Sequence, residues 1–347
     1  MKRILHILHS GNFSGAENIA MNLGLMFKEY YDIAFAIPKY GNFKKKLEEV
    51  GLNYILLDNF NLKELYNKIN RFNPHIIHAH DFRASIFSGI LFPKKCIISH
   101  LHNNPPWIRF PNVYSITYLM LISQFKKIIG VSNAIRNEFF CNFLMSSKFI
   151  CLPNFVNESL IIKKAQEPCN IKNIDLLYIG RLTKPKDPIK FINIIKFLKK
   201  YFPHIKAVML GDGELKEKCI KEIKYNNLSS NVFLLGFVEN PYTYMKESKL
   251  VIITSQWEGF GLVAVEAMVL GKPILASPVG GLKDIIVHNK TGFFCREIDD
   301  YVRSILYLFS NPQRYLEFSA NAVLESQRYT NIDIYKEKLL TIYEGCK

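Results

Sequence analysis

Residues 254–273 read TSQWEGFGLVAVEAMVLGKP and follow the apolar run LVII at 250–253. That run is short, uninterrupted and rich in β-branched residues, which is typical of a strand buried on both faces of a sheet. A turn carrying Gly259 and Gly261 comes next, and a helix is expected from about Leu262 to Leu270, closed by the Gly-Lys-Pro that ends the stretch. A buried strand, a glycine turn and a helix form part of a βα unit, so this stretch predicts an α/β protein with a parallel sheet.

The same alternation of apolar runs and helix-period segments extends along the chain in both directions. The expected strands of the first half are 3–9, 32–37, 53–57, 75–78, 96–102, 127–131 and 149–152, and those of the second half begin at 175, 206, 231, 250 and 273. Between the halves, residues 153–173 are polar, contain two prolines and have no clear period, which predicts a linker. The chain is therefore expected to form two open α/β domains, residues 1–165 and 172–330. The helical segment from about 331 to 347 is expected to pack back onto the first domain.

Composition narrows the classes of function. A chain of 347 residues has room for about two domains, and its net charge of +15 lies mostly in the first half. Such a field favours phosphate ligands, anionic lipids or nucleic acid, although richness in Lys and Asn could equally follow genome composition. The seven cysteines are scattered and never spaced CxxC, so neither a disulfide framework nor a zinc site is indicated, and a reducing cytosol is the default. No signal or membrane-spanning segment is expected.

Two carboxylates flank the glycine turn. Glu258 precedes it and Glu266 lies in the first turns of the following helix, whose free N–H groups suit an anion. An anion site beside carboxylates fits a ligand with both phosphate and hydroxyl groups. The alternative is that Glu266 only complements the helix dipole while Glu258 is solvated.

A second loop is basic. Gly180 ends a strand, and Arg181, Lys184 and Lys186 follow it ahead of a helix that Asp187 is expected to cap. Cations at the carboxyl end of a strand can clamp a phosphate, although a solvated basic loop has the same composition. The nearby Gly211-Asp-Gly turn lacks the third glycine and the acidic strand end of a dinucleotide site, which argues against NAD.

The order of these segments resembles the retaining, nucleotide-sugar-dependent glycosyltransferases of family 4, which have the two-domain GT-B architecture. The stretch from Glu258 to Glu266 resembles the family's two glutamates separated by seven residues, and Gly180-Arg-Leu with Lys186 resembles its basic loop. Ser10–Glu17 resembles the glycine loop after the first strand, and His100-Leu-His-Asn resembles the amino-domain histidine motif. The resemblance implies two Rossmann-like domains that face each other across a cleft holding the site.

Matching positions then imply roles for single residues. Arg181 and Lys186 would bind the donor diphosphate, and Glu266 would bind the ribose hydroxyls. Glu258 would hold the sugar together with backbone amides of residues 260–262, and residues 236–238 would contact the base. The residues expected to be catalytic are His102, Glu258, Arg181 and Lys186. Those expected to bind the donor are Gly15, Gly180, Gly211, Gly236, Phe237, Val238, Gly259, Phe260, Gly261, Leu262 and Glu266.

Histidines mark the first half. His100 and His102 alternate on one expected strand, so both point to one face, and one of them should end at the cleft. The family resemblance favours His102, although a strand histidine is often a core residue with satisfied hydrogen bonds. His78 and His80 form a similar pair that is expected to line the acceptor side.

The sequence favours a mechanism without a metal or any other cofactor. Asp-x-Asp ends none of the expected strands, and Asp299-Asp300 lies at an expected helix start, where capping explains it. Fixed cations and helix amides would stabilise the departing nucleotide diphosphate, and the acceptor hydroxyl would attack from the face that this group leaves.

We therefore expect a retaining transferase that moves a hexose or N-acetylhexosamine from a nucleotide sugar to a glycan or lipid-linked acceptor. Its setting would be the assembly of bacterial surface polysaccharide, lipopolysaccharide or capsule, in the cytoplasm and peripherally on the inner face of the cell membrane. The expected membrane-facing residues are Trp107, Arg109, Phe110, Tyr114, Phe125, Lys126 and Lys127, with Lys44 to Lys46. The alternative for this half is an ordinary solvated face over a buried aromatic helix.

Two other functions remain open. A sugar-nucleotide epimerase of the same architecture would use a comparable donor cleft without a second sugar. A nucleic-acid-binding protein would explain the positive charge, but the sequence has no aromatic RNA-binding strand motif and no zinc-finger spacing, so nucleic acid is not an expected partner.

Overall fold

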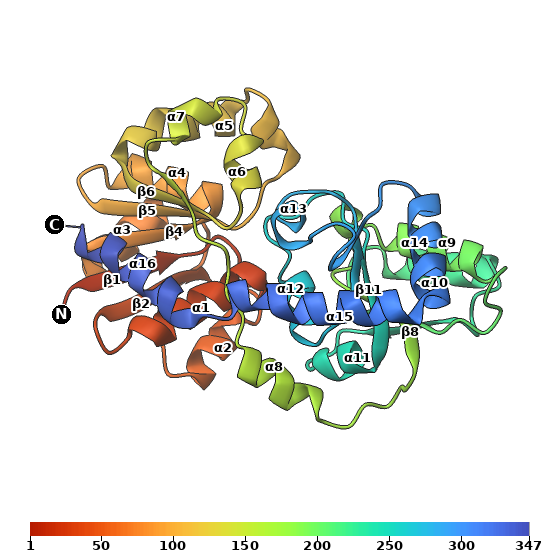
Figure 1. Ribbon diagram of the computed structural model, residues 1–347. Helices are drawn as coiled ribbons and strands as arrows, with labels where there is room; N and C mark the ends of the chain where they lie inside the picture. The colour runs from red at the N-terminus through yellow and green to blue at the C-terminus, as the bar shows by residue number, and fades with distance from the viewer. Residues whose placement is uncertain (347) are drawn as a thin grey trace. The chain divides into compact units, whose positions relative to one another are not determined.

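The structure, a computed structural model, describes residues 1–346 and divides into two compact units (Figure 1). The first unit contains residues 1–154 and the chain from Asp333 onward, and the second contains Phe155–Ile332. Each unit has one parallel sheet with helices packed on it. The expected α/β class and the two Rossmann-like sheets are confirmed.

The first unit has a seven-stranded sheet in the order β3-β2-β1-β4-β5-β6-β7. Its strands are β1 Arg3–Ile7, β2 Asp32–Pro38, β3 Asn53–Leu57, β4 Ile76–His80, β5 Cys96–Leu101, β6 Phe125–Gly130 and β7 Phe149–Cys151. Its helices are α1 Gly15–Phe27, α2 Phe43–Glu49, α3 Leu62–Phe72, α4 Asp81–Leu91, α5 Val113–Leu121, α6 Asn133–Asn137, α7 Asn142–Met145 and α16 Ile332–Glu344, with short 3₁₀ turns η1 Pro106–Arg109 and η2 Ile122–Gln124. All seven strands lie where the apolar runs predict them.

The second unit has a six-stranded sheet in the order β10-β9-β8-β11-β12-β13. Its strands are β8 Ile174–Ile179, β9 Ala207–Leu210, β10 Val232–Gly236, β11 Ser248–Ile253, β12 Ile274–Ala276 and β13 Gly292–Phe294. Its helices are α8 Glu158–Ala165, α9 Pro188–Leu198, α10 Lys216–Tyr225, α11 Tyr242–Glu247, α12 Leu262–Val269, α13 Leu282–Ile285, α14 Ile298–Ser310 and α15 Pro312–Ser326, with 3₁₀ turns η3 Lys184–Lys186 and η4 Gln327–Tyr329.

Two segments of the second unit differ from expectation. The stretch expected to be a linker contains helix α8, which begins where the side chain of Asn157 accepts a hydrogen bond from Leu160 N and buries Ile161 and Ala165. Because α8 packs on α11 and α12, residues 155–165 belong to the second unit rather than to the first. The short strand β13 was not predicted; it is defined by its pairing with β12, which is a tertiary contact.

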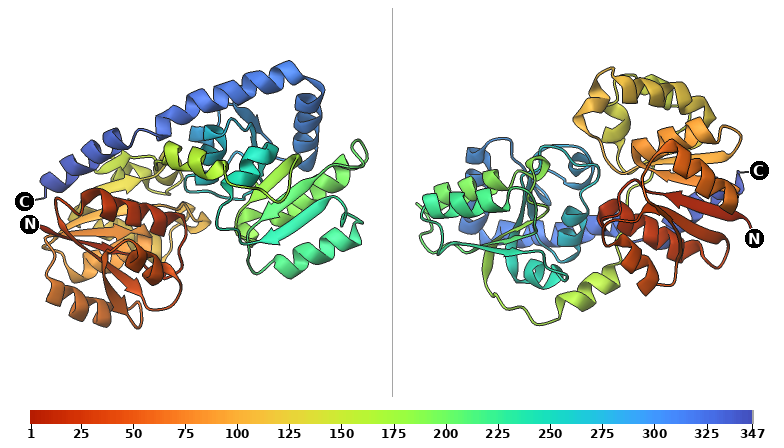
Figure 2. Two further views of the ribbon diagram at one scale, coloured as in Figure 1. Left: turned by 90° about the horizontal axis from the view of Figure 1, so that it is seen from below. Right: turned by 180° about the vertical axis from the view of Figure 1, so that it is seen from behind.

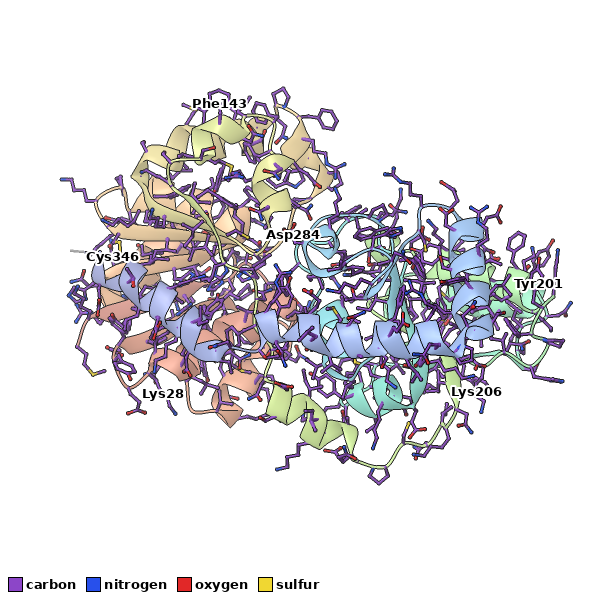
Figure 3. The ribbon with its side chains drawn as sticks, viewed as in Figure 1. Lys28, Phe143, Tyr201, Lys206, Asp284 and Cys346 are labelled. Carbon is purple, nitrogen blue, oxygen red and sulfur yellow. A yellow bond between two sulfur atoms is a disulfide. The ribbon has the colours of Figure 1, made fainter. Side chains whose placement is uncertain are left out.

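Helix α16 returns to the first unit, and the two chain ends lie at the same side of that unit (Figure 2). Its Tyr343 is fully buried against Phe27 and Tyr31, with ring centroids 5.3 and 5.6 Å away. A disulfide joins Cys96 at the start of β5 to Cys346 just after α16 (Figure 3). The expectation of no disulfide is therefore wrong, because the two cysteines meet only through the packing of α16.

Within residues 1–346, no helix has the length and apolar character needed to cross a bilayer.

Candidate active site

The strand orders locate one candidate edge in each unit. Ligands of open parallel sheets bind beyond the carboxyl ends of the strands, where neighbouring strands connect in opposite directions. In the second sheet that switch point lies between β8 and β11, and in the first it lies between β1 and β4. Of the expected site residues, Gly15 and His102 belong to the first unit and all the others to the second.

The loops after β8 and β11 bring three of the expected catalytic residues to one edge. The ammonium group of Lys186 forms an ion pair with Glu258 Oε1, and their side chains are only 25% and 13% exposed. Ser255 Oγ donates to the same carboxylate oxygen at 2.8 Å. Arg181, one residue beyond Gly180, is exposed and has no ion pair within the described chain. The edge therefore presents a free guanidinium beside an ammonium group that a carboxylate holds in place.

The basic loop is built as the sequence predicts. Asp187 Oδ1 accepts a hydrogen bond from Lys190 N at 3.2 Å and so caps α9, with Pro188 at the first helical position. Thr254, after β11, donates from Oγ1 to the carbonyl oxygens of Lys186 and Asp187 at 3.0 and 2.8 Å. These hydrogen bonds connect the loop after β8 to the loop after β11 at the switch point.

Glycines allow the neighbouring loops to approach closely. Gly211 has φ of 139°, and a Cβ there would lie 2.0 Å from the carbonyl oxygen of Gly180. Gly261 has φ of 109° at the start of α12, and a Cβ there would lie 2.6 Å from the Leu282 side chain. No side chain caps α12, so its first N–H groups are available to a ligand. The Phe260 ring is buried against Tyr329, which leaves only its backbone for such contacts.

Glu266 lies one turn into α12 and is half-buried. Tyr242, on α11, donates its hydroxyl to Glu266 Oε1 at 3.1 Å. Burial raises the pKa of Glu266 from 4.5 to about 7, against the opposing effect of the tyrosine hydrogen bond. Near neutral pH this carboxyl group can therefore both donate and accept hydrogen bonds.

The turn after β10 carries the residues expected to contact the base. Gly236 has φ of 77°, and the Phe237 ring that follows it is 78% exposed. An exposed aromatic ring at the carboxyl edge of a parallel sheet can stack on a flat heterocycle. Val238 is half-buried beside it.

Five histidines occupy one face of the first sheet. His6 lies on β1, His78 and His80 on β4, His100 on β5, and His102 one residue beyond it. The rings of His100 and His102 are 4.1 Å apart between centroids, so both do point to one face. Three hydrogen bonds join rings on neighbouring strands, and a fourth joins His78 Nδ1 to Tyr343 Oη at 2.7 Å.

Burial keeps these rings neutral. It lowers the pKa of His6 and His102 to about 3, and the pKa values of His78, His80 and His100 fall well below their usual range, also mainly through burial. His102 itself is half-buried and lies at the carboxyl end of its strand. The His102 side chain at the carboxyl edge of the first sheet is therefore an uncharged imidazole.

Asp81 supports the same edge. It begins α4 with φ of 68°, and its Oδ1 accepts the backbone N–H of His102 at 2.8 Å. Burial raises its pKa to about 6 in spite of the backbone hydrogen bonds from residues 102 and 103. The sequence analysis missed Asp81, although its place directly after the His78-Ala-His80 strand was a usable signal.

The glycine loop after β1 leads into α1 at Gly15. Ser14 Oγ donates to Glu17 Oε2 at 2.5 Å, and burial raises the pKa of Glu17 in spite of this bond. His9, two residues beyond β1, has its pKa lowered mainly by burial. Glu17 and His9 are further titratable groups that the sequence analysis did not single out.

The histidines also offer the clearest metal-type donor set. Each of two groups, His6 with His78 and His80, and His80 with His100 and His102, has three nitrogen atoms within 4.8 Å of one another. Ligand atoms around a tetrahedral zinc are about 3.3 Å apart, given Zn–N distances of about 2.0 Å. The hydrogen-bonded nitrogens here lie 2.8–3.1 Å apart, so the rings are paired with each other. These spacings favour a hydrogen-bonded network over a chelate.

A cavity in the second unit lies away from this chemistry. Asp175, Tyr201, Ile205, Lys249 and Phe309 are among the residues that line it. Asp175 and Lys249 stand at the starts of β8 and β11, so the cavity is at the amino ends of the strands. Parallel sheets do not place their active sites at that edge.

The two parallel sheets and their order place the chain in the structural class of GT-B glycosyltransferases. Anabaena Alr3699/HepE, solved with UDP-glucose, matches with a TM-score of 0.85 at 22% identity, over 99% of this chain and 100% of that one. Residues 15–160 match the model "Glycosyltransferase Family 4", and residues 161–324 match "Glycosyl transferases group 1". The chain belongs to this glycosyltransferase family, as the sequence motifs predict.

Similar curated proteins cover parts of the chain. The uncharacterized glycosyltransferase MJ1059 of Methanocaldococcus jannaschii is 28% identical over 60% of this chain and 57% of its own length. An N-acetylgalactosamine-N,N'-diacetylbacillosaminyl-diphospho-undecaprenol 4-alpha-N-acetylgalactosaminyltransferase of Campylobacter jejuni is 37% identical over 37% of this chain and 34% of its own length. The chain therefore spans less than two thirds of either relative.

Proposed function

We propose that the protein transfers a hexose or N-acetylhexosamine from a UDP-sugar to a glycan or lipid-linked acceptor, with retention of the anomeric configuration. The observation that carries this proposal is the edge of the second sheet, where Arg181, the Lys186–Glu258 ion pair and the start of α12 converge at the switch point. Such an edge suits a diphosphate that is linked on both sides to groups carrying hydroxyls. The UDP-glucose complex of the HepE structure supports UDP as the nucleotide.

The second unit would act mainly by electrostatics. When the bond between the sugar and the diphosphate breaks, negative charge grows on the departing phosphate, and Arg181, Lys186 and the α12 amides stabilise it. Glu258 would orient Lys186 and accept a sugar hydroxyl, and Glu266 would bind the ribose hydroxyls. Because these cations and amides would stabilise the developing charge, we propose that the reaction needs no metal.

The first unit would supply the acceptor side and His102. A neutral imidazole can hydrogen-bond a sugar oxygen without adding charge near the anomeric carbon, where positive charge develops. The acceptor hydroxyl would attack from the face that the phosphate leaves, and that phosphate would take its proton.

Ligand protection against thermal unfolding tests the donor. UDP-, GDP- and ADP-sugars are compared at equal concentration, and only the UDP-sugars should raise the melting temperature. Protection by none of them would refute the proposed donor site. Incubation of the protective donor with lipid-linked oligosaccharides, followed by mass spectrometry, then tests transfer. Nucleotide release without any acceptor would favour the epimerase instead.

Exposed apolar side chains in the first unit favour an acceptor at a membrane. We name five of them the α5 surface: Phe110, Val113, Tyr114, Met120 and Phe143, which are 63–78% exposed. Phe143 lies at the periphery of this unit (Figure 3). The segment that leads to α7 contacts η1 through a hydrogen bond from Phe140 N to Ile108 O at 3.0 Å. Phe125, which was expected on this surface, is instead fully buried.

Positive charge adjoins the α5 surface. Lys148 donates to the carbonyl oxygens of Ser123 and Phe125, just beyond α5, at 2.5 and 2.6 Å. Burial and the charges of Lys126 and Lys127, the two residues after Phe125, lower its pKa. Apolar side chains beside clustered lysines favour an anionic bilayer, on the inner face of the cell membrane.

Vesicle co-sedimentation tests this surface. Phosphatidylglycerol vesicles should bind the protein more strongly than phosphatidylcholine vesicles, and Val113→Ser with Met120→Ser should weaken binding severalfold. Tyr225→Ser is the matched control, because Tyr225 is 84% exposed on α10 of the second unit. Binding that ignores lipid charge or survives the double substitution would refute the membrane contact.

A further inference from the structure

Three of the five histidines form a single hydrogen-bonded file from β1 through β4 to the residue after β5. We name this file, His6, His80 and His102, the histidine row. His6 Nδ1 lies 2.9 Å from His80 Nε2, and His80 Nδ1 lies 2.8 Å from His102 Nε2. The two end nitrogens, His6 Nε2 and His102 Nδ1, are buried and have no hydrogen-bond partner among residues 1–346. Of the six ring nitrogens in the row, four therefore take part in hydrogen bonds and the two at the ends do not.

The number of protons restricts this row to two arrangements. Burial lowers the pKa of each ring, so each is neutral and carries one N–H. Two of the three protons occupy the two hydrogen bonds, and the third must sit on one of the terminal nitrogens. If it sits on His102 Nδ1, all three rings are protonated at Nδ1. If it sits on His6 Nε2, all three are protonated at Nε2.

The surroundings of the two ends differ. His6 is fully buried between Phe35 and His78, with ring centroids 4.9 Å away on both sides, so an N–H at its Nε2 would have no acceptor. His102 is half-buried at the carboxyl end of its strand, so its Nδ1, although covered like His6 Nε2, lies at the edge of the sheet where ligands of parallel sheets bind. A buried N–H without an acceptor is costlier and rarer than a bare acceptor atom. The terminal proton therefore belongs on His102 Nδ1.

We propose that the histidine row fixes the tautomer of His102, so that its Nδ1–H is a standing hydrogen-bond donor to an oxygen atom of the ligand. His80 and His6 are then positioning residues, since they act on the ligand only through His102. The tautomer itself follows from the first unit alone. Its effect on turnover rests on the proposed sugar transfer, in which the donor would meet a sugar hydroxyl or ring oxygen.

A second hydrogen-bonded file, beside the histidine row, provides a control for the coupling between His80 and His102. Tyr343 Oη, His78 and His100 are joined by bonds of 2.7 and 3.1 Å and share no hydrogen bond with the row. Its terminal hydroxyl can donate or accept, so proton counting sets no single tautomer there. Loss of that hydroxyl should leave His102 unchanged.

Nitrogen-15 NMR of the full-length protein with labelled histidine tests the tautomer without any ligand. Resonances are assigned by single substitutions, and the shifts separate protonated from bare ring nitrogens. Wild-type His6, His80 and His102 should all carry the proton on Nδ1, unlike free histidine, which favours Nε2. A proton on Nε2 of any of the three would overturn the proposal.

Three variants test the coupling. His80→Leu removes the donor to His102 Nε2, so the Nδ1–H population of His102 should fall. His80→Asn, whose amide nitrogen can replace the ring Nδ1, should restore it, and Tyr343→Phe should not alter it. A His102 that keeps a pure Nδ1–H form in His80→Leu would show that the row does not set the tautomer.

Turnover is measured on the same variants. His80→Leu should lower kcat about tenfold or more with little change in KM for the donor, and His80→Asn should recover most of it. If the NMR pattern holds but kcat is unchanged, the tautomer stands and its catalytic effect is refuted. If thermal protection finds no nucleotide sugar, the proposed function fails while the NMR result remains valid.

Discussion

The two sheet edges hold opposite kinds of polar group. The edge of the second unit carries charge: an exposed Arg181 and the partly buried Lys186–Glu258 ion pair. The edge of the first unit carries imidazoles that desolvation keeps neutral, beside the buried carboxyl group of Asp81. Cationic side chains suit the binding of a diphosphate. Desolvated neutral groups suit oriented hydrogen bonds to hydroxyl groups. The comparison suggests a division of labour between binding the leaving group and handling the sugar.

Removing the free cation of the charged edge should have the largest effect. Arg181→Ala is expected to lower kcat about 100- to 1000-fold, or about 3 to 4 kcal/mol of barrier, because in the proposed reaction the guanidinium would stabilise charge that appears only in the transition state. Steady-state kinetics with the donor identified by thermal protection measures this. Lys196→Ala, at an exposed lysine on α9, is the matched control and should be close to wild type. Equal rates for both variants would remove Arg181 from the mechanism.

Removing the disulfide should lower the stability of the first unit and leave that of the second unit unchanged. Cys346→Ser is expected to lower the free energy of unfolding of the first unit by about 3 kcal/mol, because the Cys96–Cys346 bond holds α16 and its Tyr343 against the histidine face. Urea unfolding followed by a probe in each unit would separate the two transitions. Thiol titration of the unfolded, unreduced wild type should find five free cysteines. Seven would contradict the disulfide.

Removing one partner of the Lys186–Glu258 ion pair should lower the free energy of unfolding by less than it would in a fully buried ion pair. Lys186→Met is expected to lower the free energy of unfolding by about 1 to 2 kcal/mol, because Glu258 then lacks its partner in a partly buried site. Adding Glu258→Gln should restore part of that loss, and a double-mutant cycle in urea measures the coupling. Additive losses would mean that the two side chains do not stabilise each other.

Glu266 is the one group of the charged edge that burial keeps partly protonated. Its pKa is raised from 4.5 to about 7, so the folded state binds more protons than the unfolded state between these values. Stability due to this group is therefore fully present below about pH 4.5 and is lost as pH rises toward 7. Glu266→Gln should flatten this decline in a series of melting temperatures.

The same substitution should weaken donor binding. We expect KM for the donor to rise about tenfold with kcat nearly unchanged, which corresponds to about 1.4 kcal/mol for a hydrogen bond to a charged group. A change in kcat alone would place Glu266 in the chemical step rather than in ribose binding. An unchanged pH profile of stability would show that its carboxyl group titrates normally.

Local sequence patterns determined the elements of this protein well. Every strand of the first sheet is marked by an apolar run. The cap at Asp187 and the capping box of Glu297 with Asp300 at the start of α14 follow from residue types a few positions apart. The glycine turns before α12 and after β8 were found for the same reason, because close backbone approach requires residues without a side chain. These features depend on neighbours a few residues apart, which a single sequence contains.

Only the tertiary structure decided which of these groups meet. The contacts between His6 and His80, Lys186 and Glu258, and Cys96 and Cys346 join residues 72 to 250 positions apart. The periodicity of a strand gives the face on which a histidine lies, but the diagonal bonds between strands depend on register, and pKa values depend on burial. The sequence therefore determined the kinds of chemistry present at each edge, while packing decided which groups are charged, paired or held neutral.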